Sequence, residues 1–530
     1  MMKKITPYAG LLLSVAFLSY GADGLFSIFP AADAPSFLQV PSELVYNSKY
    51  QPWASVSHWS DEVDEKDVFH AELQHQSIGE RSWVIKIGKG GQLYSIVSSW
   101  GETVPPQSAK SPWNDDVWQA TVLNTKILDQ DKALKGRANA FIHQSGMYVR
   151  NYEGQEDLNS KPFYSPMLAF GFNEKERSYS TLCWGLIPTP SVNRGETLIY
   201  SKYRDLGAGV IEITYAFYNF GDYTLNDLTF PWGGVRTSVF PEQVVADKKG
   251  GYRFFTPFNY GIEGCHIDIK DTGGWIARVQ NAADPAGYAL GIVFGKDRHW
   301  DEQSQLKKAG KPFYQNSPTV CGSGDSRHGK RDYSVLAVAP RILVRPGEAF
   351  FMRVYMVLGT LEEVAAKSAQ LVDHVEYGFL DYDENNAPLL PLYDDRKTGL
   401  TSQPPTDKAE PVAYSYAVPV KGSVPLFQLK ETATGKVVLS TDPYALCGKK
   451  PFANPYSKGD PKYETYQNRV IYQPYDGKTE WLGLLGYVMP EKLAAKKSSG
   501  RSLSGVLSER RFFVPGDKPD MDELLIRTEK

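Results

Sequence analysis

Apolar and polar residues alternate along much of this chain, and the clearest run lies between residues 200 and 242. Within it, every second position from 211 to 217 is apolar, which predicts a β-strand with one buried face. The opposite face carries a carboxylate at Glu212 and a phenol at Tyr218. Asn219 and residues 221–222 have turn chemistry, so residues 223–230 are expected to return as the partner strand.

The same pattern recurs along the chain and favours an all-β fold. Further strands are predicted in six segments: 83–87, 93–97, 275–279, 288–294, 333–338 and 350–358. Residues 88–91 are glycine-rich but connect two strands, so they are expected to form a hairpin turn. Helical spacing of apolar residues appears in one place, from Leu361 to about His374. We therefore expect a large antiparallel β-sandwich.

Shifts in composition divide the chain into five segments. These are a signal peptide at 1–21, a loop-rich segment at 22–80, the large β domain at 81–380, a linker at 381–412, and a small β module with its tail at 413–530. The signal peptide has a basic start at Lys3 and Lys4 and an apolar run from Tyr8 to Leu18. That run is shorter than the ~20 residues that span a bilayer, so secretion or a periplasmic location is expected rather than a retained anchor.

Charge and cysteine content restrict the classes of partner and the state of the thiols. The net charge is −3 and no long basic run occurs, which argues against nucleic acid, and no stable membrane insertion is expected after signal cleavage. The four cysteines allow two disulfides or four unpaired thiols. No cofactor is expected. A divalent metal stays open. Asp297 and His299 are two potential metal ligands, but no third ligand lies at a diagnostic spacing.

One short segment combines the side chains needed for proton transfer. His143, Tyr148 and Arg150 supply an acid or base, a phenol and a fixed cation. In β-elimination from a uronic acid, a cation neutralises the carboxylate while His or Tyr side chains remove and return protons. Arg204 and Arg236, beyond the two ends of the central strand pair, are candidates for that cation.

Rings and polar groups elsewhere predict a sugar-binding surface, since indole and phenol rings stack on sugar C–H faces. The predicted binding residues are Arg150, Tyr203, Glu212, Trp232, Arg236, Trp113 and Trp118. For each of these residues the alternative is that the side chain packs in the hydrophobic core and does not contact a sugar.

Two segments resemble known families. A Tyr-Arg-Asp segment at 203–205 and a Pro-Trp-Gly-Gly corner at 231–234 resemble the β-supersandwich of galactose mutarotase-like domains and of several polysaccharide lyases, over about residues 80–360. The helical toroid that precedes this sheet in many such lyases is missing, so their catalytic residues are not carried over by position. Residues 425–488 are similar to short extracellular repeats found beside hydrolase domains, which implies an accessory module.

The first functional expectation is a polysaccharide lyase that uses His143 and Tyr148 for proton transfer and Arg204 on the substrate carboxylate. Two alternatives stay open. One is a glycoside hydrolase or an aldose epimerase-like enzyme with paired carboxylates, drawn from Glu212, Glu242, Asp115 and Asp116. The other is a glycan-binding protein without catalysis. The expected partner in each case is a polysaccharide, and the oligomeric state is open.

Overall fold

A computed structural model describes the chain in segments that are mostly strands. The described residues are 45–46, 69–78, 81–88, 91, 93–98, 101–104, 119–124, 141–143, 147–148, 162–163, 167–173, 175–186, 194–221, 225–235, 239–255, 258–259, 266–296, 319–324, 334–339, 344–380, 382, 385, 387–394, 400–402, 404–411, 413–442, 445–446, 448–451, 456–461, 463–467, 470–473, 478–489 and 512–513. Their structure is all-β apart from short helices, as the sequence predicts. The predicted signal peptide, Trp113, Trp118, Arg150 and Arg236 lie outside them.

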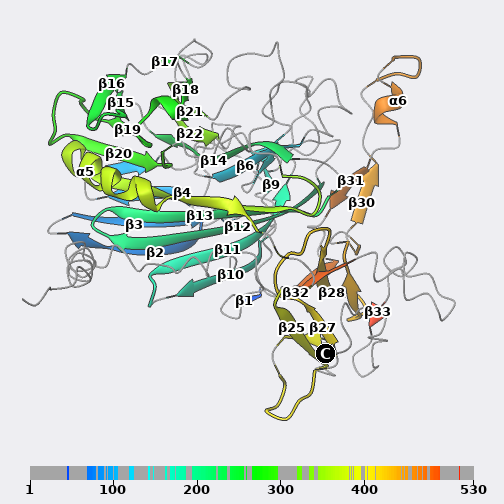
Figure 1. Ribbon diagram of the computed structural model, residues 1–530. Helices are drawn as coiled ribbons and strands as arrows, with labels where there is room; N and C mark the ends of the chain where they lie inside the picture. The colour runs from blue at the N-terminus through cyan, green and yellow to red at the C-terminus, as the bar shows by residue number, and fades with distance from the viewer. Residues whose placement is uncertain are drawn as a thin grey trace, which may run out of the picture.

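Long antiparallel strands form the main layer of the sandwich (Figure 1). In hydrogen-bonded order they are β1 (Val45–Tyr46), β10 (Met167–Asn173), β11 (Ser178–Leu186), β12 (Arg194–Gly207), β13 (Val210–Asn219), β23 (Ala349–Thr360), β20 (Tyr288–Val293), β19 (Trp275–Val279), β15 (Glu242–Ala246) and β16 (Tyr252–Phe255). Strand β24 (Glu376–Phe379) pairs with the first part of β23, beside β20. The strands predicted at 275–279, 288–294 and 350–358 belong to this layer.

A second layer and a smaller sheet complete the sandwich. The second layer contains β7 (Phe141–His143), β6 (Gln119–Asn124), β14 (Leu225–Val235), β22 (Ser334–Ala339), β21 (Thr319–Gly324), β18 (His266–Asp268) and β17 (Phe258–Asn259). The smaller sheet contains β2 (Phe69–Ile78), β3 (Arg81–Gly88), β4 (Leu93–Ser98) and β5 (Gly101–Val104). Two short strands, β8 (Met147–Tyr148) and β9 (Pro162–Phe163), pair with each other.

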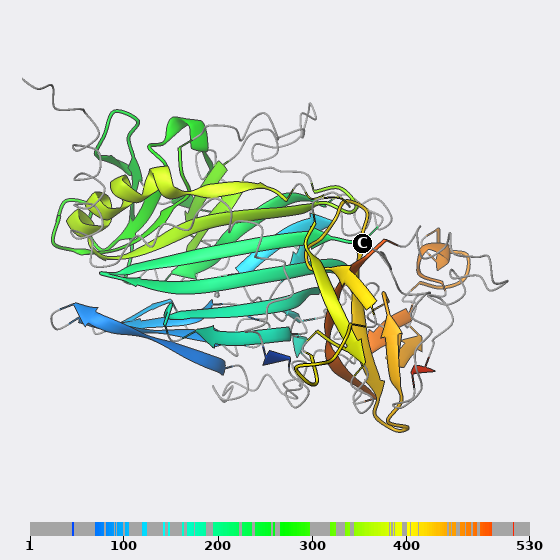
Figure 2. The same cartoon turned by 60° about the horizontal axis from the view of Figure 1, so that its bottom comes forward.

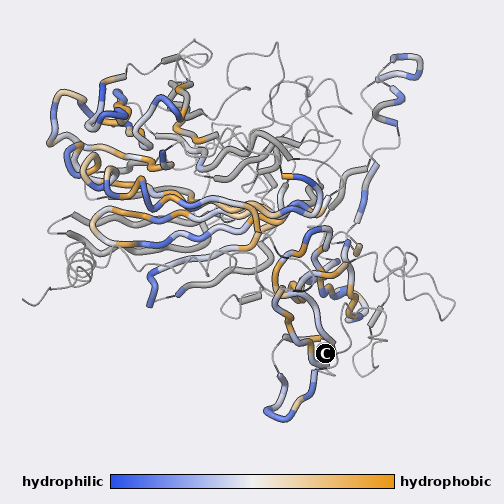
Figure 3. The backbone as a smooth tube through the Cα atoms, viewed as in Figure 1, coloured by the Kyte–Doolittle hydropathy of each residue, from blue (hydrophilic) through white to orange (hydrophobic). Residues whose placement is uncertain are grey.

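The inner core lies between the layers and follows the predicted alternation. Along β13, Ile211, Ile213, Tyr215 and Phe217 all belong to this core. Residues of β22 and of β4 pack against it from the other layers. Hydrophobic residues accordingly gather where the long strands pack in the middle of the molecule, and hydrophilic residues gather at outer turns (Figure 3).

The central strand pair differs from the prediction. Strand β13 pairs with β12 on one side and with β23 on the other, so neither edge is open to residues 223–230. Those residues fall in β14, which joins β6 and β22 in the second layer. Asn219 ends β13 here, because its buried amide donates to Val344 O and accepts from Gly221 N. The turn chemistry was therefore identified correctly, but it directs the chain to the other layer.

Two units cover the outer face of β13, whereas the alternation in the sequence predicts that only one face of this strand is buried. Every residue of β13 is buried. Near Val210, helix α5 (Leu361–Leu371) covers the face together with the one-turn helix η5 (Val372–His374). The helix begins at a capping box, in which Thr360 accepts from Glu363 N and Glu363 accepts from Thr360 N. The predicted helix at 361–374 is therefore confirmed.

The C-terminal module covers the other end of the same face (Figure 2). Its sheet consists of β25 (Leu389–Asp394), β26 (Leu400–Thr401), β27 (Ala413–Tyr416), β28 (Val424–Glu431), β29 (Val437–Ser440), β32 (Thr479–Val488) and β33 (Phe512–Phe513). A projecting arm carries β30 (Gly448–Pro451), β31 (Val470–Gln473) and α6 (Tyr463–Tyr466). Two strands, β25 and β26, come from the range 381–412, for which the sequence favoured a linker.

A shared hydrophobic cluster joins the module to the main layer. Leu198 and Tyr218 of the main layer pack in one cluster with Tyr487 of the module. The Tyr218 hydroxyl donates to Ser423 O, and its ring meets Tyr487 edge-on with ring centroids 5.3 Å apart. The Tyr218 ring therefore anchors the module and does not face solvent.

Candidate functional site

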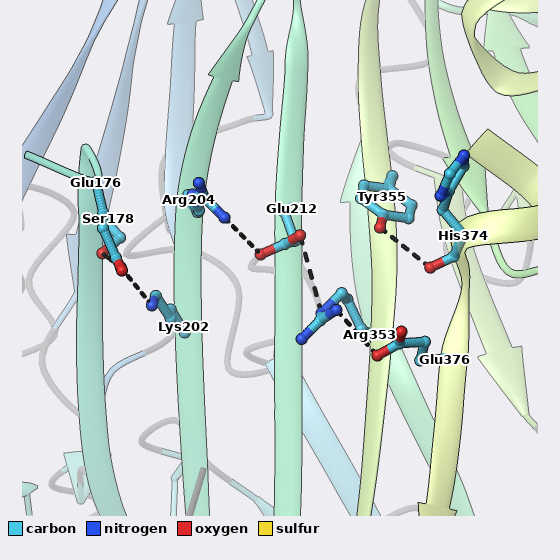
Figure 4. Close-up of polar contacts among 9 residues, drawn as sticks. All are labelled: Glu176, Ser178, Lys202, Arg204, Glu212, Arg353, Tyr355, His374 and Glu376. Atoms are coloured by element: carbon cyan, nitrogen blue, oxygen red, sulfur yellow. Dashed lines mark hydrogen bonds and ion pairs between the residues drawn. The ribbon is translucent and has the colours of Figure 1, made fainter. Parts of the chain in front are cut away.

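Between helix α5 and the C-terminal module, the outer face of the main layer carries six charged side chains (Figure 4). We call them the charged row: Glu176, Lys202, Arg204, Glu212, Arg353 and Glu376. They follow one another across the turn before β11 and the strands β12, β13, β23 and β24. With three acids and three bases, the row has no net formal charge.

Strand register creates this row from residues far apart in sequence. Arg204 lies opposite Glu212 in the β12–β13 ladder, and Glu212 lies opposite Tyr355, two positions from Arg353 on the same face of β23. Glu376 lies opposite Arg353 in the β23–β24 ladder. Antiparallel pairs on one face are close enough to interact, so the ladders place acids beside bases.

The contacts along the row become closer toward its two ends. Lys202 Nζ is 2.6 Å from Glu176 Oε2, and Arg353 Nη1 is 2.9 Å from Glu376 Oε2. In the middle, Glu212 is 3.9 Å from Arg204 Nη1 and 3.8 Å from Arg353 Nε. These central distances exceed those of a charge-assisted hydrogen bond, about 2.7–2.9 Å.

Burial is deepest in the middle of the row, where Glu212 is 5 % exposed, Arg204 8 % and Arg353 4 %. Burial raises the pKa of the Glu212 carboxyl, because it disfavours the ionised form more than Arg353 and Arg204 favour it. The end residue Glu176 behaves oppositely: burial opposes ionisation, but Lys202 outweighs it, and the pKa of Glu176 is lowered. The row thus contains one carboxyl that retains its proton to higher pH than usual.

The residues predicted from sequence divide into three groups. Arg204 and Glu212 belong to the charged row. Tyr203 is the chain neighbour of Arg204 and therefore points to the opposite face, where it is fully buried and its hydroxyl donates to Gly91 O at 2.9 Å. Burial also raises the pKa of the Tyr203 phenol well above its usual value. Tyr203 and Arg204 therefore lie on opposite faces of the main layer.

The third group lies at the far end of β12. His143 of β7 pairs with Leu186 of β11, and Leu186 pairs with Arg194 of β12. Ten residues separate Arg194 from Arg204, so the register places His143 roughly 30 Å along the strand direction from Arg204. His143 and Arg204 are therefore not brought together.

Trp232 lies in the same layer as His143, away from Arg204. Thr121 of β6 pairs with both His143 and Thr229, and Trp232 follows Thr229 by three residues in β14. Two strand spacings and three residues correspond to roughly 14 Å between the Cα atoms of His143 and Trp232. Tyr148 lies in β8, five residues after His143, which limits their separation to about 18 Å.

Sequence reasoning missed the remaining members of the charged row. Lys202 is in phase with Arg204 on β12, and Arg353 is the one charged residue inside the apolar strand β23. A charge within an otherwise buried strand is the signal that identifies Arg353 without coordinates. Glu376 follows the helix and had no such signal.

A metal site and a membrane-spanning helix can both be assessed on the described residues. In the described part of the chain, no cluster of three or more histidine, cysteine or acidic side chains is arranged to hold a metal ion. None of the described helices has the length and apolar character needed to cross a membrane. Cys183 is buried, and its thiol donates to Thr181 Oγ1 at 3.7 Å.

Comparisons with known proteins return solved structures only. No protein-family model matches the chain, and no curated protein sequence matches it. Similar structures include an α-galactosidase from Geobacillus stearothermophilus, with 13% identity and a TM-score of 0.29, over 57% of this chain and 42% of that one. A putative aldose 1-epimerase from Escherichia coli K12 has 10% identity and a TM-score of 0.29, over 55% of this chain and 99% of that one.

A polysaccharide lyase is also among them, with 12% identity and a TM-score of 0.25, over 80% of this chain and 48% of that one. This chain thus spans less than half of the α-galactosidase and of the lyase. The neighbours thus include a putative aldose 1-epimerase and a polysaccharide lyase, the two kinds of protein that the sequence resembles.

Proposed function

We propose that the protein is an exported carbohydrate-active enzyme, and that its reaction is β-elimination on a uronic acid-containing polysaccharide. One observation carries the proposal: His143 and Trp232 occupy the same layer roughly 14 Å apart, a spacing that a short oligosaccharide can bridge. His143 supplies a proton-transfer group and Trp232 a ring for stacking. Tyr148, five residues along the chain, supplies the second proton-transfer group.

The strand register changes the role proposed for Arg204. A cation must lie at the carboxylate of the reacting sugar to lower the pKa of its α-proton. Arg204 is too far from His143 to contact the same sugar, so Arg150 or Arg236 is the proposed partner of that carboxylate. Arg204 belongs to the second candidate below.

The proposal is tested by incubating the purified protein with a panel of uronic acid polysaccharides. β-Elimination produces an unsaturated sugar whose ultraviolet absorbance grows with time. His143→Ala and Tyr148→Phe should each lower this rate by roughly 10²–10⁴ while leaving the melting temperature within a degree or two of the parent. Full activity in a stable His143→Ala protein would remove His143 from the reaction.

A second candidate is a glycoside hydrolase or epimerase that uses paired carboxylates. Glu212 and Glu376 contact the same Arg353 guanidinium, so their carboxylate oxygens lie within about 9 Å, in the range used by such enzymes. The raised pKa of Glu212 suits a general acid. New reducing ends or anomer exchange without ultraviolet absorbance, lost in Glu212→Gln, would favour this reaction over elimination. Binding without any product would leave a glycan-binding protein.

A further inference from the structure

A hairpin at one edge of the main layer carries aromatic and basic side chains that belong to neither candidate site. Strands β15 and β16 form it, and β16 is the last strand of this layer in the described part of the chain. The hairpin lies at the end of the molecule away from the C-terminal module (Figure 1). We call residues 247–254 and 270–271 the hairpin surface.

Two rings lie on the outer face of β16. Tyr252 is opposite Ala246 and Phe254 is opposite Val244, so both rings point to the face that α5 covers farther along the layer. Tyr252 is half-buried, since its ring packs against Trp275 with ring centroids 6.0 Å apart. Phe254 is 52 % exposed, and among the described residues it is the one large hydrophobic side chain that is exposed. An exposed ring on an edge strand offers a flat apolar surface on which a sugar stacks.

Positive charge lies beside these rings. The hairpin surface has four exposed basic side chains: Lys248, Lys249, Arg253 and Lys270. Its acids are Asp247 and Asp271, so four bases against two acids give a net formal charge of +2, in a chain whose net charge is −3. This local excess of positive charge favours an anionic partner.

Hydrogen bonds hold the hairpin surface in one arrangement. Asp247 Oδ1 accepts from Lys249 N at 3.0 Å within the turn, and Arg253 Nη2 donates to Asp271 O at 3.2 Å. Lys248 Nζ is 3.7 Å from Asp271 Oδ1, and both side chains are more than half exposed. An exposed ion pair of this kind is weak, so the carboxylate of a ligand can replace Asp271 at Lys248.

We propose that the hairpin surface is a secondary binding surface for the uronic acid-containing polysaccharide, remote from the reacting sugar. The inference rests on the proposed function for the substrate class. Sugar C–H faces stack on Phe254 and Tyr252, and sugar carboxylates pair with the lysines of the turn. Along the main layer, β16 is seven strand spacings, or roughly 34 Å, from β11, the strand that pairs with His143 of β7. A polymer therefore reaches both places, and a short oligosaccharide does not.

Binding to polymers of different charge tests the proposal. Affinity electrophoresis and calorimetry measure the dissociation constants of the full chain for polygalacturonate and for neutral dextran. Polygalacturonate should bind more tightly at about 50 mM than at about 500 mM salt, because salt screens exposed charges. Dextran should bind at least about tenfold more weakly, because it lacks carboxylates.

Two hairpin variants and a matched control locate the binding. Phe254→Ala should weaken polygalacturonate binding roughly two- to tenfold without lowering the melting temperature, because the exposed ring stacks on sugar. Lys248→Ser with Lys249→Ser should weaken it by a similar factor at low salt and by less at high salt. Lys408→Ser with Lys458→Ser removes the same charge from exposed positions in the C-terminal part of the chain and should leave binding unchanged. Both hairpin variants should keep the parent's rate on a uronate trisaccharide, which is too short to reach the hairpin.

Three outcomes overturn the proposal: no binding of polygalacturonate by the parent, equal binding of dextran, or an unchanged affinity in either hairpin variant. If the lysines only keep the edge strand from pairing with another copy of the chain, the lysine variant will aggregate in light scattering with its affinity unchanged, which is the third outcome. A parent that forms unsaturated product while the hairpin variants bind as it does contradicts the hairpin surface alone. A parent that binds polygalacturonate through the hairpin without forming product contradicts the proposed reaction alone.

Discussion

Glu212 occupies the least favourable position in the charged row. Its carboxylate is nearly inaccessible to water, its two arginine neighbours remain 3.8 and 3.9 Å away, and no hydrogen bond joins it to another described residue. Removing a carboxylate from water without close partners is costly, so burial raises the pKa of Glu212 above its value in the unfolded chain. A residue of this kind links stability to pH.

The sign of that linkage follows from the raised pKa of Glu212. The folded state holds this proton more tightly than the unfolded state, so its contribution to stability is fully present below the unfolded pKa of about 4.3 and is lost as pH rises through the folded pKa. Glu212→Gln cannot ionise, so we expect its stability relative to the parent to increase as pH rises through that window. Urea unfolding between pH 4 and 8 measures the difference.

Glu176→Gln is the matched control with the opposite sign. The pKa of Glu176 is lowered, so its contribution is present above the unfolded pKa and is lost as pH falls through the folded pKa. This variant should therefore lose stability relative to the parent at neutral pH and approach it in acid. Parallel pH profiles for both variants would contradict the assignment of Glu212 as the carboxyl with the raised pKa.

Among the elements, the β12–β13 hairpin shows what sequence can and cannot predict. Alternation along 210–218 identified the strand and its inner face, since side-chain direction in a strand is a local property. The predicted pairing partner of that strand was wrong, because the turn residues after Asn219 specify that the chain changes direction but not which strand it joins. The charged row was missed for the same reason, since its members meet only through long-range strand pairing.

The tight turn of this hairpin also contains a strained residue. Gly207 pairs with Val210, and the two residues between them, Ala208 and Gly209, both have positive φ, at 51° and 85°. This is the backbone of a type I′ turn, in which asparagine is favoured at the first position and alanine is not.

Ala208→Asn should therefore raise the free energy of unfolding by roughly 0.5–1 kcal/mol, since it relieves that strain. The Ala208 backbone oxygen, which accepts a hydrogen bond from Lys367, is unchanged by the substitution. Ala208→Val is the control and should destabilise, because a β-branched residue fits positive φ poorly. Equal stability of the three proteins in urea unfolding would contradict this description of the turn.

For the whole molecule, the decisive feature is the cluster shared by the main layer and the C-terminal module. Leu198, Tyr218 and Phe351 of the main layer pack with Phe427 and Tyr487 of the module. An apolar interface of this kind couples two units, so the domain and its module are expected to unfold in one transition.

Tyr218→Phe tests the coupling, because the lost hydroxyl leaves Ser423 groups without their partner across the interface. We expect a loss of about 1–3 kcal/mol and the appearance of a separate, earlier transition of the module in calorimetry. Tyr200→Phe is the control: Tyr200 donates to Ser180 within the main layer, so its loss should lower stability without splitting the transition. A single transition in both variants would mean that this hydroxyl does not control the coupling.

The alternation of the two faces gives the charged row a consequence for the folding pathway. If β12 and β13 paired one residue out of step, Arg204 or Glu212 would enter the apolar core between the layers. An unpaired charge there costs so much that misaligned hairpins are rejected early, whereas an all-apolar hairpin would tolerate the slip. We therefore expect the row to favour the correct strand register while the sheet assembles. Replacing Arg204 and Glu212 together by leucine should lower the refolding yield by more than the change in the free energy of unfolding accounts for. Refolding yield and urea unfolding, each measured on the parent and on the double variant, test this expectation.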